Sequence, residues 1–381
     1  MSDWRTYTLG EVTKNFDSVR VPVKSAERVP GPYPYYGASG VVDHVANFLF
    51  DGDFLLIAED GENLRTRKTP VAFMAEGKFW VNNHAHVVQG NHLANTRFLC
   101  YAFSCTDISG HLSGSTQPKL TQASLNAVKV KLPDRAQQDA VVGVLGALDE
   151  KIAVNKRIAA TSHELGLALF VQAVMDGVGI EVAVDSISSV LVRGIAPKYS
   201  TSPDDLVVLN QKCIRDGRVN LTYSRLTLRG KVKDAKLLSR NDVLVNSTGV
   251  GTLGRVARWT SDEDATVDSH ITIVRFDEAQ VDPVCAGFAM LRAQPEIEAM
   301  GEGSTGQTEL RRTQLGRLEI SLPSKERQRE LRPKLDSLEE RIDQAVHESQ
   351  ILATLRDTLL PQLVSGRLRV KDAEKIVEDA V

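Results

Sequence analysis

A glycine-rich run is the first candidate for a ligand-binding site in this sequence. Gly249-Val250-Gly251-Thr252-Leu253-Gly254 follows an apolar segment and fits the G-x-G-x-x-G pattern of dinucleotide-binding sites. Such a site needs a helix N-terminus after the glycines to hold the pyrophosphate, yet Arg255–Trp259 has the pattern of another strand. We therefore expect a hairpin whose backbone can approach a phosphate or a groove closely.

Histidines form the second group. His84 and His86 would share one face of a strand, and His92 follows, but no carboxylate or cysteine stands near them in the sequence to complete a metal set. The sequence therefore predicts no metal site. His84 is expected to serve recognition or to be a satisfied structural histidine, while His163 and His347 fall in helical segments where a solvated position is the default.

Nucleophilic catalysis has no support in the sequence. Asp268-Ser269-His270 is too compact for a triad, because neighbouring strand side chains point to opposite faces, and no nucleophile elbow is present. We also find no P-loop, no defensible nuclease cluster and no Asn-Pro-Pro-aromatic string of amino methyltransferases. The chain is predicted to be a non-catalytic reader or scaffold that holds no cofactor of its own.

The elements that must position these residues occur twice. Upstream matches such as Val81–His84 with Val267–His270 are joined by a run of downstream matches that keep one offset of 190 residues. Each copy has short branched or alternating runs typical of strands, followed by a long helix. The pairs at this offset include Leu125 with Leu315, Val130 with Ile320, Pro133 with Pro323, Gln138 with Gln328, Leu145 with Leu335, Ile152 with Ile342 and Leu165 with Leu355.

The long helices show apolar residues at alternating spacings of three and four, which is typical of coiled coils. Asp134 and Ser324 are plausible N-caps, and Gly177 and Pro361 are expected to mark the ends. A seam this narrow needs a partner, and the other copy is the cheapest one. The predicted seam consists of Val141, Leu145, Leu148, Ile152, Leu165, Leu169, Leu331, Leu335, Leu338, Ile342, Leu352, Leu355 and Leu359.

We predict an α+β fold of two similar recognition domains, each followed by a long helix, with the two helices pairing as an antiparallel coiled coil. Parallel pairing would bring the two β-rich parts together, and antiparallel pairing would separate them. Asn155 either fixes the register of the seam or faces water. The expected segments are 1–132 for the first domain, 133–176 for its helix, 177–322 for the second domain, 323–365 for its helix and 366–381 for a C-terminal tail.

Composition agrees with two or three globular domains, since 42% of the 381 residues are apolar and 25% are charged. No stretch approaches about 18 uninterrupted apolar residues, so no membrane span is expected. Met1–Arg5 lacks the apolar core of a signal peptide. Cys100, Cys105, Cys213 and Cys285 lack metal-ligand spacing and are expected to be reduced thiols of a cytoplasmic protein.

Charge is distributed unevenly although the net charge is only -3. Residues 211–260 hold 11 Lys and Arg against 3 Asp and Glu, whereas residues 261–309 hold 2 against 11. The first block could bind phosphates. Alternatively, the two blocks are solvated faces of one domain that offset each other.

Several segments make the whole chain resemble the specificity subunits of type I restriction-modification systems. The helix starts share a Leu-Pro pair followed by Gln, and Leu359–Leu363 with Ser365-Gly366 is also similar to that family. The other segments that carry the resemblance are Tyr35–Gly40 and Leu56–Gly61 in the first copy and Asn210–Ile214 and Asp242–Gly249 in the second.

The resemblance implies that each recognition domain reads one half of a split sequence in double-stranded DNA. It also implies that the helices act as a spacer and dock two methyltransferase subunits, which use S-adenosylmethionine and through which restriction subunits join. The absence of catalytic motifs is expected in such a subunit.

DNA-contact candidates are side chains that can pair with base edges or phosphates and that lie beside glycines on loops or strand ends. In the first copy they are Gly37, Ser39, Asn63, Arg65, Arg67, Lys68, Asn82, His84, Gln117 and Lys119. In the second copy they are Gln211, Lys212, Arg215, Asn246, Ser247, Thr248, Arg255, His270, Gln307, Arg311 and Arg312. For each of them, a surface or turn role is the competing interpretation.

Two other function classes remain open from the residues alone. One is a coiled-coil adaptor whose globular heads bind protein. The other is a cofactor-dependent enzyme, which requires a helix after Gly254.

Overall fold

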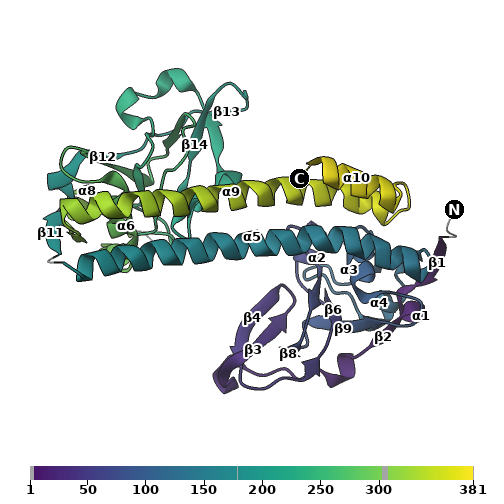
Figure 1. Ribbon diagram of the computed structural model, residues 1–381. Coiled ribbons are helices and arrows are strands. Elements are labelled where there is room, and N and C mark those ends of the chain that lie inside the picture. Colours follow the sequence, from purple (N-terminus) through teal and green to yellow (C-terminus); the bar gives the residue numbers. More distant parts are fainter. Residues whose placement is uncertain (1–3, 178, 303–307, 381) are drawn as a thin grey trace. The chain divides into compact units, whose positions relative to one another are not determined.

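The computed structural model describes residues 4–177, 179–302 and 308–380. It divides into two compact units (Figure 1). Unit 1 comprises residues 1–155 with 347–381, and unit 2 comprises residues 156–346. Two long helices, α5 (Arg135–Met175) and α9 (Lys325–Leu363), each contribute residues to both units.

Unit 1 is built on a four-stranded antiparallel sheet in the order β2-β9-β6-β7. All five residues of its central strand, Phe54–Ala58, are buried, because α3 covers one face and a second sheet of order β4-β3-β8-β5 covers the other. The strands are β1 Arg5–Thr8, β2 Thr13–Asn15, β3 Pro30–Gly37, β4 Gly40–Val45, β5 Phe50–Asp51, β6 Phe54–Ala58, β7 Ala72–Ala75, β8 Lys78–Val81, β9 Ala85–Gly90 and β10 Lys129–Leu132. The short helices are α1 Leu9–Val12, α2 Asn63–Thr66, α3 Thr96–Ser104 and α4 Gln122–Asn126.

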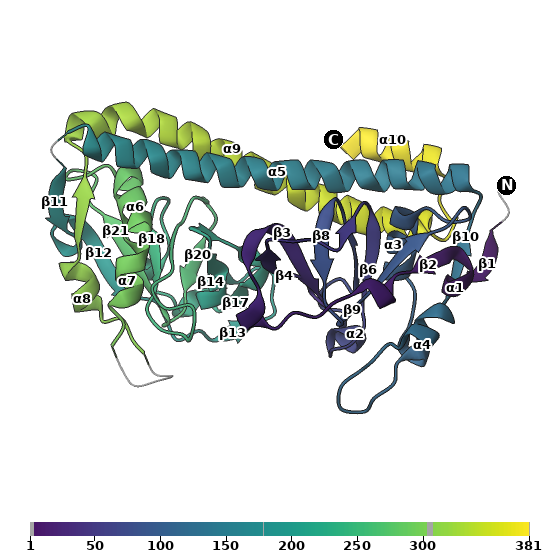
Figure 2. The same cartoon turned by 90° about the horizontal axis from the view of Figure 1, so that it is seen from below.

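Unit 2 repeats this plan with the sheet order β12-β21-β18-β19. Figure 2 shows α6 beside β21 and β18 of this sheet. Helix α3 has the equivalent position in unit 1. The strands are β11 Ile180–Ala183, β12 Ser188–Arg193, β13 Tyr199–Ser200, β14 Leu206–Leu209, β15 Ile214–Arg215, β16 Arg218–Val219, β17 Arg225–Thr227, β18 Val243–Asn246, β19 Val256–Arg258, β20 Ala265–Val267, β21 Ile271–Phe276 and β22 Glu319–Leu322. The helices are α6 Pro283–Arg292, α7 Gln294–Ala299 and α8 Arg312–Arg317.

The globular part of each unit, without the long helices, is called its head. Equivalent glutamines join each head to the start of the long helix that follows it. The buried Gln138 side chain donates to Pro133 O at 2.9 Å and accepts from Asn95 N, the N-cap of α3, at 2.8 Å. Gln328 donates to Pro323 O at 2.7 Å and accepts from the N–H of Asp282, the N-cap of α6, at 2.9 Å. The predicted internal duplication is therefore confirmed down to single hydrogen bonds.

The long helices begin at the predicted caps. Asp134 Oδ1 accepts from Gln137 N at 2.9 Å, and Ser324 Oγ accepts from Arg327 N at 3.3 Å. With 41 and 39 residues, both helices are about 60 Å long at the standard rise. Pro361 does not mark the end of α9, since it lies inside the last turns of that helix.

The helices pair in antiparallel fashion within unit 1. Asn155 Nδ2 donates to Glu348 Oε2 at 2.6 Å, and Asp149 Oδ1 accepts from Arg356 at 2.8 Å, so partners descend along α9 as residues ascend along α5. Val141, Leu145, Leu148, Ile152, Leu352 and Leu359 are buried, and Leu355 is half-buried. Asn155 is 2% exposed, so it is a buried polar seam position and does not face water.

In unit 2 the predicted seam needs one correction. Leu331, Leu335 and Ile342 are buried and Leu169 and Leu338 are half-buried, but Leu165 is 48% exposed. Gly166 lies on the seam instead, because the ring of Phe288 from α6 packs onto α5 there; an added Cβ would lie 3.0 Å from that ring. At Gly166, α5 therefore packs against α6 of the head. The spacing of apolar residues in a two-helix coiled coil does not predict such a third helix.

Two further expectations change. By length and composition alone, α5 is apolar enough to cross a membrane, with a window of mean hydropathy 1.3, although its seam packs against α9 and both cores. The segment predicted as a tail contains helix α10 (Val370–Ala380), whose Ala373 is buried in unit 1. All four cysteines are free, as predicted.

Candidate nucleic-acid interface

Three loops meet at the same place in each unit. In unit 1 they are Glu59–Gly61 after β6, Asn82–His84 before β9, and Gln117–Leu120 before α4, which we call loop cluster 1. Leu120 N donates to Glu59 O at 2.8 Å, and Glu59 N donates to His84 O at 2.9 Å. These backbone hydrogen bonds bring together the predicted residues Asn82, His84, Gln117 and Lys119.

The histidines of loop cluster 1 have separate roles. His84 is exposed, its Nδ1 lies 2.8 Å from Asp60 Oδ2, and its backbone N donates to Asn82 Oδ1 at 2.8 Å. His86 is buried and its ring lies 2.5 Å from Asp17 and 2.7 Å from Leu120 O. Each histidine therefore has its own carboxylate partner, contrary to expectation. Within the described residues no group of three His, Cys, Asp or Glu side chains is arranged to hold a metal ion.

Glu59 holds two charged side chains of loop cluster 1 and its surroundings in place. Its carboxylate lies 2.8 Å from Arg20 and 3.2 Å from Lys119 Nζ. Burial raises the pKa of Glu59, but Arg20, His86 and Lys119 outweigh it and lower the pKa overall. Glu59 thus stays ionised and fixes the exposed Lys119 at the edge of the cluster.

Other predicted residues of unit 1 mainly hold loops. Arg65 donates to Gly114 O at 2.7 Å, Arg67 donates to Thr106 O at 2.6 Å, and Asn63 closes its own loop through Thr69 O at 2.9 Å. Gly37 is buried with Asn82 Nδ2 beside it, which joins the β3–β4 hairpin to the cluster. Ser39, Lys68 and Gln117 are exposed.

Loop cluster 2 is the counterpart in unit 2 and consists of Ser247–Arg255, Asp268–His270 and Glu309–Arg311. Leu310 N donates to Ser247 O at 2.8 Å, as Leu120 does to Glu59. The exposed His270 ring lies 2.7 Å from Thr248 Oγ1, and its backbone N donates to Asp268 Oδ1 at 2.9 Å. The matched positions of His84 and His270 therefore have the same backbone setting, while the side-chain partner is a carboxylate in unit 1 and a hydroxyl in unit 2.

The glycine-rich run forms the predicted hairpin between β18 and β19. Gly249, Gly251 and Gly254 have φ values of 111°, 71° and 81°, a left-handed region that other residues rarely adopt. Strand β19 follows, so the helix that a dinucleotide site requires is missing at this point of the described chain. The tip presents Val250, which is 81% exposed and was not predicted from the sequence.

Two predicted contacts of unit 2 are wrong for this conformation, because both side chains are fully buried. Asn246 Nδ2 donates to Gln211 O and Thr252 O, each at 3.0 Å, and Ser247 Oγ lies 2.6 Å from Thr272 Oγ1. They shape the hairpin from inside.

The remaining predicted residues of unit 2 lie at or near the surface. Lys212, Arg215, Arg311 and Arg312 are exposed, and Gln211 is half-buried. Arg255, also half-buried, donates to Gly251 O at 2.9 Å. Gln307 lies outside the described residues.

Sequence reasoning also missed Arg193, which ties loop cluster 2 together. It donates to Leu310 O at 2.8 Å and to Ser269 O at 3.3 Å, and it pairs with Glu309 at 2.8 Å. No motif or spacing signals this role, since its partners lie 76 to 117 residues away.

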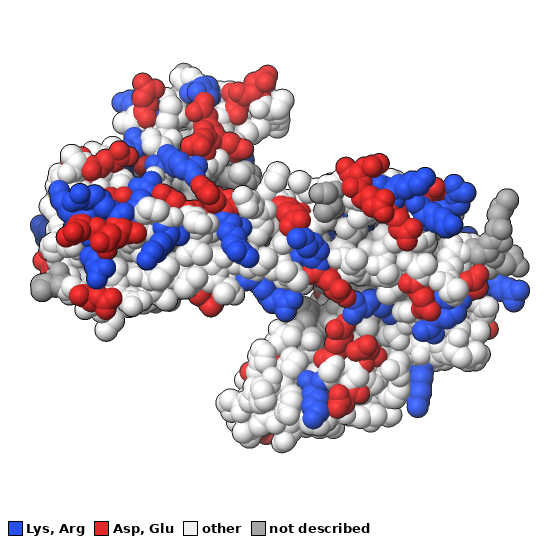
Figure 3. Space-filling model, viewed as in Figure 1, with Lys and Arg blue, Asp and Glu red and all other residues white. Residues whose placement is uncertain are grey.

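The basic and acidic blocks partly neutralise each other. Arg229 pairs with Asp264 at 2.6 Å and Arg240 pairs with Asp262 at 3.2 Å. On the face shown in Figure 3, Lys and Arg are interspersed with Asp and Glu. These pairs favour the interpretation of offsetting faces, while Lys212 and Arg215 remain exposed beside the hairpin.

Comparisons with known proteins agree on one family. Residues 1–161 match the family model described as Type I restriction modification DNA specificity domain. A type I restriction enzyme specificity subunit of Haemophilus influenzae is 39% identical over 150 residues, covering 38% of this chain and 37% of the relative. The HindI specificity subunit of the same organism is 25% identical over 244 residues, covering 55% of this chain and 50% of the relative. The chain thus spans half or less of the length of these relatives.

A solved structure shows the same fold over a longer range. The S subunit of a type I restriction-modification system from M. genitalium has a TM-score of 0.64 and 14% identity, and the match covers 95% of this chain and 96% of that chain. The first 161 residues thus match a type I restriction-modification DNA specificity domain, the chain is similar in sequence to specificity subunits over part of its length, and it shares the fold of an S subunit over nearly all of it.

Proposed function

We propose that this protein is the sequence-specific DNA-binding subunit of a type I restriction-modification complex, in which each unit reads one half of a bipartite target. The observation that carries this proposal is that loop clusters 1 and 2 lie at equivalent places in two units that share one fold. A protein that recognises two half-sites needs two similar surfaces. Both clusters present exposed hydrogen-bonding side chains on loops that are held together by backbone hydrogen bonds.

The contacts divide by chemistry. Lys68, Lys212, Arg215, Arg311 and Arg312 are exposed cations suited to phosphates. Side chains that can pair with base edges are Ser39, Asn82, His84, Gln117, Thr248 and His270.

The chain itself is proposed to be non-catalytic. Two methyltransferase subunits would dock on the paired helices and supply methyl transfer from S-adenosylmethionine, and restriction subunits would join through them. The complex would act on double-stranded DNA in the cytoplasm without a membrane partner. The adaptor alternative is not favoured, because the matched family model is a DNA specificity domain.

A methylome comparison tests this function. Host cells with and without the gene are sequenced for modified bases while the neighbouring methyltransferase gene stays intact. Loss of methylation at one split motif is the expected result, and it also reveals the bases read by each head. An unchanged methylome in cells that express both proteins would contradict the proposal and favour the adaptor.

A further inference from the structure

Each long helix carries a buried or half-buried carboxylate at the same repeat position. Asp149 on α5 and Glu339 on α9 are 190 residues apart, the offset of the duplication. Asp149 accepts a hydrogen bond from Tyr101 of the head that precedes α5, at 2.6 Å. Glu339 is likewise contacted by the head that precedes α9. The two carboxylates therefore mark one junction that occurs twice.

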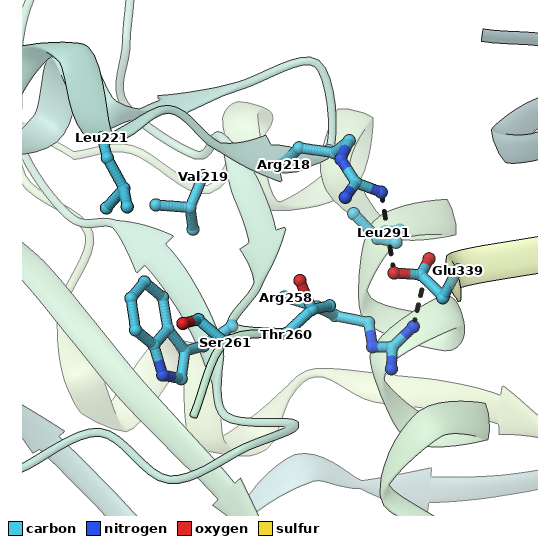
Figure 4. Close-up of a pocket in the computed structure, with 10 residues that line it drawn as sticks. Arg218, Val219, Leu221, Arg258, Thr260, Ser261, Leu291 and Glu339 are labelled. Atoms are coloured by element: carbon cyan, nitrogen blue, oxygen red, sulfur yellow. Dashed lines mark ion pairs between the residues drawn. The ribbon is translucent and has the colours of Figure 1, made fainter. Parts of the chain in front are cut away.

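In unit 2, Glu339 lies between two arginines (Figure 4). Its Oε1 is 3.4 Å from Arg258 and its Oε2 is 3.6 Å from Arg218. Glu339 and Arg258 are only 8% and 5% exposed, and Arg218 also pairs with Asp343 of α9. Charges from β16 and β19 thus converge on one face of α9.

The structure accommodates Arg258 at several points. A Cβ at position 287 of α6 would lie 2.4 Å from Arg258 Cδ, so only glycine lets the side chain pass. The guanidinium lies 5.3 Å from the ring centroid of Phe288 and donates to Asn241 Oδ1 at 3.0 Å. Its Nε and Nη1 are buried with no hydrogen-bond partner among the described residues, so Nη1 meets Glu339 as an ion pair without a hydrogen bond.

Such an arrangement is a poor way to gain stability. Burying a charge pair costs desolvation, and an apolar pair of similar size often stabilises as well or better. What a buried pair does provide is one preferred geometry, since its charges must meet at fixed points. Arg258 ends strand β19, whose other end emerges from the hairpin of loop cluster 2. A contact that fixes Arg258 on α9 therefore fixes the direction of that hairpin relative to the helix.

We propose that Glu339 and its counterpart Asp149 are positioning residues, which fix the orientation of each recognition domain on its own helix and thereby set the number of base pairs accepted between the half-sites. This inference rests on the proposed function. In this role the carboxylates do not contact DNA. Substituting them should therefore change the preferred spacing of the two half-sites and leave the bases read in each half unchanged.

The test uses the full chain assembled with its methyltransferase subunits. Duplexes carry the two half-sites from the methylome at the natural spacing, or one base pair closer or farther apart, and affinity is measured by fluorescence anisotropy. Glu339→Gln is expected to lose about tenfold of the preference for the natural spacing, since a charge-assisted contact is removed. Its base preference should stay the same. Glu340→Gln, at an exposed carboxylate next in the chain, is the matched control.

Asp149→Asn provides the same readout in unit 1, where the carboxylate is half-buried, and it decides the question if Glu339→Gln does not fold. Unchanged spacing preference in the folded variants would overturn the inference, and so would altered bases in either half-site. Failure of the wild-type complex to bind any spacing would instead contradict the proposed function, so the two failures are distinguishable.

Discussion

The two head–helix junctions keep one carboxylate and change its partners. In unit 1, Asp149 accepts from the Tyr101 hydroxyl and from Arg356 of the facing helix. In unit 2, Glu339 meets two arginines of the head, and the repeat counterpart of Arg356 is Gly166. The fold therefore fixes the position of the acid, while its donors can come from the head or from the other helix.

The aromatic residues explain why the donors differ. Tyr101 and Phe288 occupy equivalent places, each six residues after the N-cap of its helix. Burial, together with the nearby Asp149, raises the pKa of Tyr101, so its hydroxyl stays protonated and donates. Phe288 has no hydroxyl, and its ring packs on Gly166 while Arg258 reaches the acid past it. A neutral phenol in one junction thus corresponds to a buried charge in the other.

The largest expected effect is from Arg258→Ala. Glu339 would remain buried with one partner fewer, so unit 2 should lose about 3 kcal/mol of unfolding free energy. Urea denaturation followed by the fluorescence of the adjacent, buried Trp259 measures the loss. Arg240→Ala, which removes an exposed pair, should change stability by less than about 1 kcal/mol. Equal effects of the two substitutions would show that the buried arginine contributes no more to stability than the exposed one.

Tyr101→Phe converts the first junction toward the second and should have a smaller effect. Arg356 still pairs with Asp149, so the variant loses one hydrogen bond, or about 1 to 2 kcal/mol of the stability of unit 1. Thermal denaturation followed by circular dichroism measures the change. A loss as large as that of Arg258→Ala would show that the phenol contributes as much as the buried arginine does.

Two glycines in α5 differ in the space around them. Gly143 has open space around an added Cβ, so Gly143→Ala should stabilise the protein by about 1 kcal/mol through helix propensity. At Gly166 the added Cβ would lie 3.0 Å from the buried Phe288 ring, and Gly166→Ala should destabilise by about 1 kcal/mol. Melting temperatures of the two variants should therefore move in opposite directions. Parallel shifts would mean that Phe288 can move aside.

The smallest effect concerns His163, which lies on α5 near Arg218, Arg258 and Glu339. Burial lowers its pKa, and the two arginines lower it further against Glu339. Because the unfolded chain then binds the proton more readily, stability should fall as pH drops below about 6.5, by less than about 1 kcal/mol. Denaturation midpoints at pH 7.5 and 5.5 measure this, and His163→Gln should remove it. His347→Gln, at an exposed position, should keep the wild-type dependence.

Features with a local cause were predictable from the sequence. The caps Asp134 and Ser324 and most of the seam follow from periodicity and capping preference, because both act over one or two turns. The glycines at positions 249, 251 and 254 likewise indicated the β18–β19 hairpin, and all three have positive φ values in the structure.

Features with a long-range cause were not predictable. Leu165 fits the two-helix spacing only until α6 inserts Phe288 at Gly166. Asn246 sits beside glycines like an accessible loop residue, yet its amide is used to close the hairpin. Arg193 joins segments 76 to 117 residues away, and no local pattern records such a partner.

The membership of unit 1 also has a consequence for the order of synthesis. Its core includes Leu352, Leu359, Leu363 and Ala373, which are synthesised after residues 156–346, whereas unit 2 is one continuous segment. The core of unit 1 is therefore incomplete while residues 156–346 emerge. The second unit can therefore be complete in the growing chain before the first one closes, in contrast to the usual order in which the N-terminal domain folds first.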